Sequence, residues 1–183
     1  PVNDETKAAR AALRPDRTTS PDGPEEAGLA VRCISYGGPY IWAGYNSYHQ
    51  IIQTKHHVVI VQEMIHDARI IPITDRPHVD DNIRQWHGDS RGYWDGDTLV
   101  VETTNYRTNE GNIPVFFTGG GTENRRIVER FNRAGPDTVR WQVTLEDPAT
   151  WTQPWTAVMM LSSTEDAMFE YACHEGNIGL HGI

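Results

Sequence analysis

The chain has 183 residues and carries 16 Lys and Arg against 25 Asp and Glu, for a formal net charge of -9 at pH 7. This length fits one domain, or one domain with a tail. The basic residues are scattered and form no basic run, which argues against a nucleic acid as partner. No apolar stretch approaches about 18 residues, so we expect no span of a membrane.

The first 31 residues differ in composition from the rest and predict a helix followed by an extended arm. Residues 4–13 are rich in alanine, with acidic residues at the start, where they stabilise the helix dipole. Residues 15–29 are rich in Pro, Asp, Gly and Glu, which favours an extended segment. We therefore divide the chain into a helix and arm at 1–31 and a β-domain at 32–183. The start at Pro1, rather than Met, predicts either a removed leader or a trimmed sequence.

From His49 onward the apolar residues follow the two-residue period of β-strands. The pair Asp95-Gly96 predicts a tight hairpin turn. Residues 77–92 lack periodicity and predict a long loop, which in a compact domain is usually functional. We expect strands at 49–54, 57–63, 68–73, 99–104, 126–133, 138–145, 155–161 and 167–173.

Roughly eight or nine short strands without an internal helix predict an all-β fold. An antiparallel up-and-down barrel of the calycin or lipocalin type is the simplest closed arrangement, because closure removes exposed strand edges. A barrel of this size can hold one small ligand at its centre. A sandwich of two sheets is the alternative.

Cys33 and Cys173 are the only two cysteines and lie near opposite ends of the chain. This spacing does not form a metal motif, which needs close pairs. Because each cysteine flanks the expected barrel, a disulfide is favoured, while two buried thiols stay open as the alternative. A disulfide would stabilise the fold by about 4–5 kcal/mol in the chain-entropy model and would indicate an oxidising compartment.

Three long strings of the sequence look like blocks of one protein family. They are Glu63-Met-Ile-His-Asp-Ala-Arg69, Gly88-Asp-Ser-Arg-Gly-Tyr-Trp-Asp-Gly-Asp-Thr-Leu-Val-Val-Glu-Thr-Thr-Asn105 and Tyr171-Ala-Cys-His-Glu-Gly-Asn177. Over about residues 32–180 the chain resembles a widespread family of exported bacterial proteins without an assigned activity. The resemblance implies a secretory leader, a periplasmic or extracellular location and a bond between the two cysteines. It transfers no reaction.

The candidate catalytic residues are His66, His174 and Glu175. An imidazole beside a carboxylate can form a general acid–base pair, and a tethered Cys173 would hold this group at a barrel mouth. The structural alternative is a polar strand end whose side chains satisfy backbone groups.

The candidate ligand-binding residues are Arg69, Arg91, Trp94, Asn177 and Trp151. Arg69 is a candidate anion clamp, and an arginine beside a tryptophan can hold a carboxylate or an aromatic ring. A pair of tryptophans that includes Trp151 would form a stacking surface for a sugar or an aromatic ligand. The alternatives are ion pairs that hold a loop and an aromatic plug at the end of the barrel.

A metal site is the third possibility. His66, His78 and His174 could converge on one ion, with Glu63 or Glu175 as a fourth ligand, although their spacing does not show it. Beyond that metal we expect no cofactor, because the chain has no dinucleotide fingerprint, phosphate loop or nucleophile elbow.

The leading hypothesis is an exported barrel that binds a small, partly apolar or aromatic molecule, with lyase- or isomerase-type acid–base chemistry left open. The second is a structural subunit of an extracellular assembly or filament that associates through residues 1–30. The third is a metalloenzyme with histidine ligands.

Overall fold

The computed structural model describes residues 29–35, 37–39, 45–107 and 122–179, and before them residues 2, 4, 7, 8, 23, 24 and 27. Eight strands form within these ranges, and each begins within a few residues of a run of alternating or continuous apolar side chains. Their bounds are β1 His49–Gln53, β2 His57–Gln62, β3 Ala68–Pro72, β4 Asp89–Asp95, β5 Thr98–Thr104, β6 Arg126–Gly135, β7 Thr138–Glu146 and β8 Trp155–Ser162.

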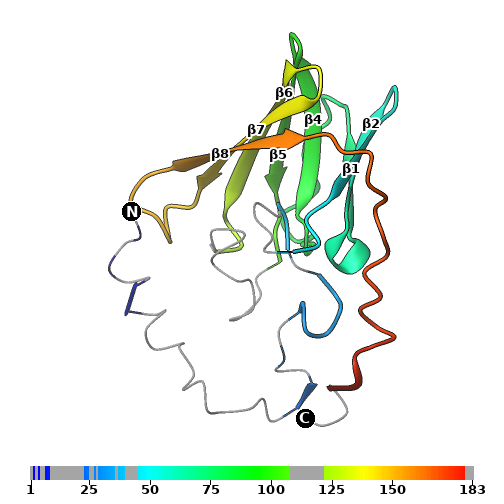
Figure 1. The fold of residues 1–183 in the computed structure, drawn as a ribbon. Coiled ribbons are helices and arrows are strands. Elements are labelled where there is room, and N and C mark those ends of the chain that lie inside the picture. Colours follow the sequence, from blue (N-terminus) through cyan, green and yellow to red (C-terminus); the bar gives the residue numbers. More distant parts are fainter. Residues whose placement is uncertain are drawn as a thin grey trace.

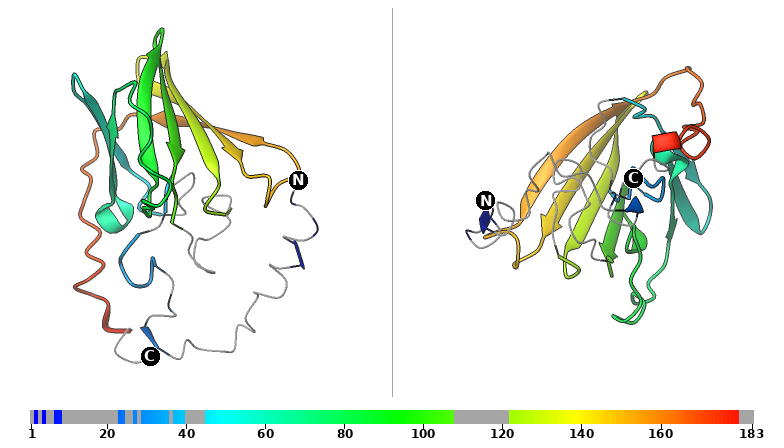
Figure 2. Two further views of the ribbon diagram at one scale, coloured as in Figure 1. Left: turned by 180° about the vertical axis from the view of Figure 1, so that it is seen from behind. Right: turned by 90° about the horizontal axis from the view of Figure 1, so that it is seen from below.

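The strands form two antiparallel sheets, in the orders β1-β2-β3 and β4-β5-β6-β7-β8 (Figure 1). The sheets meet where Ile73 and Gly92 form an isolated parallel bridge, in which Thr74 N donates to Gly92 O at 3.0 Å. A Cβ on Gly92 would lie 2.9 Å from Ile73 Cδ1, so glycine permits this close approach. Seen from below, the strands follow one another round an open curve (Figure 2).

The expected all-β, antiparallel architecture is confirmed, but the closed barrel is not found. The reason lies between β3 and β4. An up-and-down barrel needs antiparallel neighbours, whereas the bridge between Ile73 and Gly92 is parallel. The single meander therefore divides into a three-stranded and a five-stranded sheet, and β1 and β8 do not pair in the described residues.

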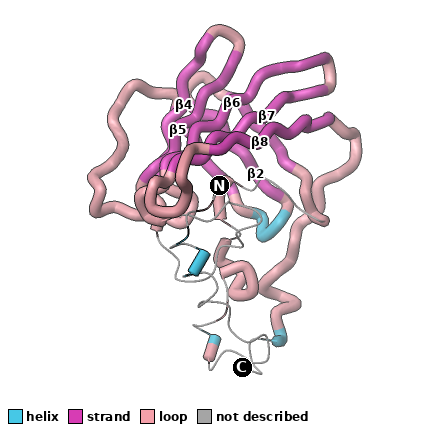
Figure 3. Tube along the Cα trace, turned by 90° about the vertical axis from the view of Figure 1, so that its left-hand side faces the viewer, coloured by secondary structure: helices cyan, strands magenta, loops and turns pink. Residues whose placement is uncertain are grey.

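The expected strand at 167–173 is wrong. The segment after β8 is irregular, as Figure 3 shows. Its Phe169 is 73% exposed, so this side chain is not packed against a sheet. The strand expected to continue to Glu63 instead ends in a 3-10 turn, η2 (Met64–His66), in which Ile65 and His66 have φ of 59° and 46°.

The N-terminal prediction falls mostly outside the described residues. Asp4, Lys7 and Ala8 are helical, and Lys7 Nζ lies 2.7 Å from Asp4 Oδ1. The rest of the helix expected at 4–13 and most of the arm at 15–29 lie outside, so this division of the chain stays a prediction.

The hydrophobic core lies between the two sheets. Alternating side chains of β2 and β3 face those of β5, β6 and β7, and the rings of Phe131 and Trp141 stack with centroids 5.4 Å apart. The buried members are Val58, Ile60, Ile71, Leu99, Val101, Tyr106, Ile127, Phe131, Trp141, Val143 and Leu145.

The predicted disulfide is confirmed: Cys33 and Cys173 are bonded, with their Cα atoms 5.7 Å apart. Asn177 Nδ2 donates to Val31 O at 2.7 Å and fastens the same two segments. In the part of the chain that is described, no helix is long and apolar enough to cross a membrane.

Candidate functional site

An open cleft of about 550 Å³ lies where β3 and β4 diverge from their single bridge. One wall is residues 68–70 of β3, and the other is residues 84–91, which lead into β4. Its volume lies within the range of about 300–1,000 Å³ that is usual for small-molecule sites. The split between the sheets, rather than a barrel mouth, therefore creates this concave site.

The floor of the cleft is Arg69, whose side chain is buried. Its Nη2 lies 2.6 Å from Glu129 Oε2 and its Nη1 lies 3.1 Å from Glu129 Oε1. Trp141 Nε1 donates to the same carboxylate at 3.1 Å. The Glu129 carboxylate, itself 0% exposed, therefore compensates the buried guanidinium and raises the pKa of Arg69 despite the opposing effect of burial.

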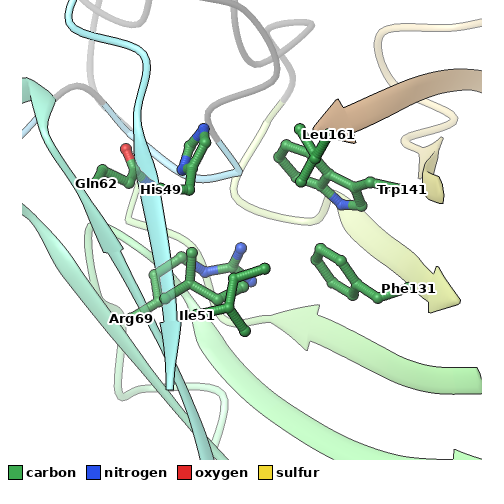
Figure 4. Close-up of a pocket in the computed structure, with 8 residues that line it drawn as sticks. His49, Ile51, Gln62, Arg69, Phe131, Trp141 and Leu161 are labelled. Carbon is green, nitrogen blue, oxygen red and sulfur yellow. The ribbon is translucent and has the colours of Figure 1, made fainter. Parts of the chain in front are cut away.

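A small cavity lies on the inner side of Arg69, between the two sheets (Figure 4). Its volume is about 10 Å³, room for about one water molecule. Gln62 Oε1 and Arg69 Nε are buried beside it without a hydrogen-bond partner among the described residues. His49 also lines it, and burial, together with the Arg69 charge, lowers the pKa of this imidazole. The interior is thus too small for the central ligand that a barrel predicts.

His87 is the histidine of the cleft wall. Its Nε2 lies 3.3 Å from Asp67 Oδ2 and 3.2 Å from Ser35 Oγ, while Gly37 N donates to that hydroxyl at 2.9 Å. Because the hydroxyl and the carboxylate meet the same ring nitrogen, this is not a serine-protease relay, which uses both nitrogens. With the proton on Nε2, Asp67 accepts it and Nδ1 carries the free lone pair. A Cβ on Gly38 would lie 2.7 Å from that Nδ1.

Two arginines flank the opening of the cleft. Arg91 Nη1 donates to Asp89 Oδ1 at 2.7 Å and to Ser90 O at 2.9 Å. Arg84 Nη1 donates to a backbone carbonyl, Glu123 O, at 2.7 Å, and no carboxylate of the described residues forms an ion pair with it. The cleft is therefore weakly cationic, with one arginine paired to a carboxylate and one not.

Of the residues predicted from the sequence, Arg69 and Arg91 line this cleft. His66 lies elsewhere, with its exposed Nδ1 3.2 Å from Tyr171 O. His174 and Glu175 are exposed in the turn that follows the disulfide, and Asn177 is used in fastening that turn. The predicted barrel-mouth group is thus split between the cleft and the disulfide end.

The remaining predicted residues do not join the cleft either. Trp94 is 45% exposed near the tip of β4, and Trp151 lines a separate groove beyond the end of β7. His78 is held by carboxylates, with Nδ1 2.8 Å from Asp89 Oδ2. Within the described ranges, no three His, Cys, Asp or Glu side chains gather as a metal site, so His66, His78 and His174 do not share one.

The sequence does not single out Ser35 or Glu129, whereas Asp67 and His87 belong to polar clusters at 63–69 and 77–94 without an assigned role. The sequence does contain a signal for Glu129, because this residue occupies an inward position of an alternating strand, between Ile127 and Phe131. A charge at such a position predicts a buried partner. The grouping of the other three has no such signal, because it depends on how distant segments meet.

Comparison of the chain with protein families, curated proteins and solved structures found no match.

Proposed function

We propose that this chain binds a small, partly apolar molecule with an anionic or carbonyl group in the cleft between β3 and β4. The cleft itself is the observation that carries the proposal, because it combines ligand-sized volume with apolar and polar walls. Ile70, 65% exposed, supplies apolar surface on one wall, and Trp86 supplies an aromatic ring on the other. Arg84 at the rim would attract the charged or carbonyl end.

Acid–base chemistry on the bound molecule is the extension that His87 supports. A carboxylate that accepts the Nε2 proton orients the ring and leaves Nδ1 as the nitrogen that can accept a proton. The proposed step is removal of a proton from the ligand by His87 Nδ1. Return of that proton to another atom of the ligand is an isomerase-type reaction, and its transfer to a group that leaves as its bond to the ligand breaks is a lyase-type reaction. Nδ1 is covered next to Gly38, so the segment at 37–39 would have to shift to admit the ligand.

Thermal-shift screening of small carboxylic acids and carbonyl compounds tests the binding, followed by titration calorimetry on each compound that stabilises the protein. We expect Arg84→Gln to weaken binding by about tenfold. His87→Gln should abolish any turnover while changing affinity less. His56→Gln, in the exposed turn before β2, is the matched control. Equal affinity in the wild type and the Arg84 variant, for every compound found, would remove the cleft as the site.

Export is part of the same proposal. The disulfide and the lack of a membrane-spanning helix in the described residues are compatible with a periplasmic or extracellular protein. Cell fractionation of the full-length gene product tests it. The assembly hypothesis depends on residues 1–30, most of which lie outside the described part, and the calycin-like closed barrel stays a prediction.

A further inference from the structure

A second groove, of about 330 Å³, lies at the end of the large sheet and shares no residue with the cleft. Its walls are the turn that follows β7, residues 147–154, and the residues that precede and begin β6. Trp151 supplies its aromatic surface, and Asn124, Thr152 and Gln153 are exposed around it. The volume is at the lower end of the range for small-molecule sites.

The Trp151 platform is held rigidly by its turn. Trp151 N donates to Asp147 O at 2.8 Å, while the Asp147 carboxylate accepts bonds from Thr122 N at 2.5 Å and Thr150 Oγ1 at 2.7 Å. The Trp155 ring meets Trp151 edge to face, with centroids 5.6 Å apart. A ligand that stacks on Trp151 would therefore order little of the protein, which favours binding.

The charges beside the groove are already paired. Arg126 donates to Glu102 Oε2 at 2.5 Å and to Glu146 Oε2 at 3.0 Å, and both contacts raise the pKa of its guanidinium. Asp147 is used within its own turn. An added anion would meet two carboxylates, and an added cation would compete with Arg126. A neutral ligand fits this arrangement better than either.

The polar side chains around the groove further restrict the class of ligand that it can bind. Asn124 and Gln153 each carry an amide that both donates and accepts, and Thr152 adds a hydroxyl. A flat aromatic ring surrounded by amides and hydroxyls suits a molecule with an apolar C–H face and hydroxyl groups at its edge. We propose that this groove binds a neutral carbohydrate, with one pyranose ring stacked on Trp151 and its hydroxyls bonded to Asn124 and Gln153.

The probes are neutral oligosaccharides, namely cello-, xylo-, malto- and N-acetylchito-oligomers, with an oligogalacturonate as the acidic comparison. Binding is measured by saturation-transfer NMR and by titration of tryptophan fluorescence on the full chain. We expect at least one neutral series to bind with a dissociation constant below about 10 mM. We expect the acidic series to bind more weakly. Failure of all four neutral series, or tighter binding of the acidic one, would overturn the proposal.

Variants locate the binding. Trp151→Ala should weaken it by at least about tenfold. Because Trp151 also packs against the core, the double variant Asn124→Ala with Gln153→Ala, which changes only exposed side chains, is the second test and should weaken it by a similar factor. Gln85→Ala, in the cleft between β3 and β4, is the control and should leave carbohydrate binding unchanged. Undiminished binding by the double variant would show that this groove is not the site.

Discussion

The substitution Glu129→Gln tests the most consequential contact of the fold. It keeps the shape of the side chain and removes its charge, so the guanidinium of Arg69 loses the one carboxylate that contacts it among the described residues, at 2.6 Å and 3.1 Å. The other partners of Arg69 are the hydroxyls of Ser90 and Thr103 at 3.4 Å and 3.5 Å, which are neutral and at the limit of hydrogen bonding. Because both charged groups are buried, we expect the free energy of unfolding to fall by about 3–5 kcal/mol.

Urea unfolding monitored by tryptophan fluorescence and circular dichroism measures this loss. Asp95→Asn is the matched control, because its carboxylate pairs with Arg130 at 2.7 Å on the surface, where it is 60% exposed. We expect that control to cost at most about 1 kcal/mol. The double variant Arg69→Met with Glu129→Leu removes both charges and should be more stable than Glu129→Gln. A loss of unfolding free energy below about 1 kcal/mol in Glu129→Gln would refute a charge-compensated core. So would a loss in the double variant as large as the summed losses of Arg69→Met and Glu129→Leu measured separately.

Three further predictions concern pH, the disulfide and backbone conformation. Burial lowers the pKa of His49, so as the pH falls below about 6.5 the unfolded chain binds a proton at this residue before the folded protein does. The free energy of unfolding should therefore decrease on acidification. Urea midpoints measured between about pH 5 and 8 should depend less on pH in His49→Gln than in the wild type. Replacing Cys33 and Cys173 by Ser should lower stability by about 4–5 kcal/mol, and thermal melts with and without reductant on the wild type give the same comparison. Gly88→Ala should destabilise by more than Gly96→Ala in calorimetry, since both have positive φ but only at Gly88 would a Cβ lie 2.5 Å from a backbone oxygen.

The hairpin of β6 and β7 is the part of the fold that the sequence predicts best, whereas the loop expected at 77–92 overlaps β4, which begins at Asp89. Buried side chains alternate with less buried ones from Arg126 to Phe131 and from Trp141 to Leu145, and the predicted strand ends lie within two residues of those observed. Local alternation decides such a hairpin because register and buried face are set together. The parallel contact between Ile73 and Gly92 has no local signal in the sequence, so the division into two sheets could not be predicted. The strand predicted at 167–173 does not form, because no strand of the described residues pairs with this segment.

The candidate site is less predictable for the same reason. When only nearby residues are considered, Arg69 is expected to bind an anion at the surface, close to Asp67. In the structure the guanidinium of Arg69 is buried, and its partner Glu129 lies 60 positions away in the sequence. Ser35 and His87 are 52 positions apart and meet at one ring nitrogen. Spacing along a strand predicts which face a side chain occupies, but it does not predict which distant segment covers that face.

The bond between Cys33 and Cys173 joins positions on either side of all eight strands, so the whole β-structure is one covalent macrocycle. A single proteolytic nick in the exposed stretch at 75–77 would therefore linearise the macrocycle without releasing a fragment. The nicked protein should migrate as one species on a non-reducing gel and as two on a reducing gel. Its new termini would fall between β3 and β4, at the boundary between the two sheets, which makes this stretch the natural place for a circular permutant.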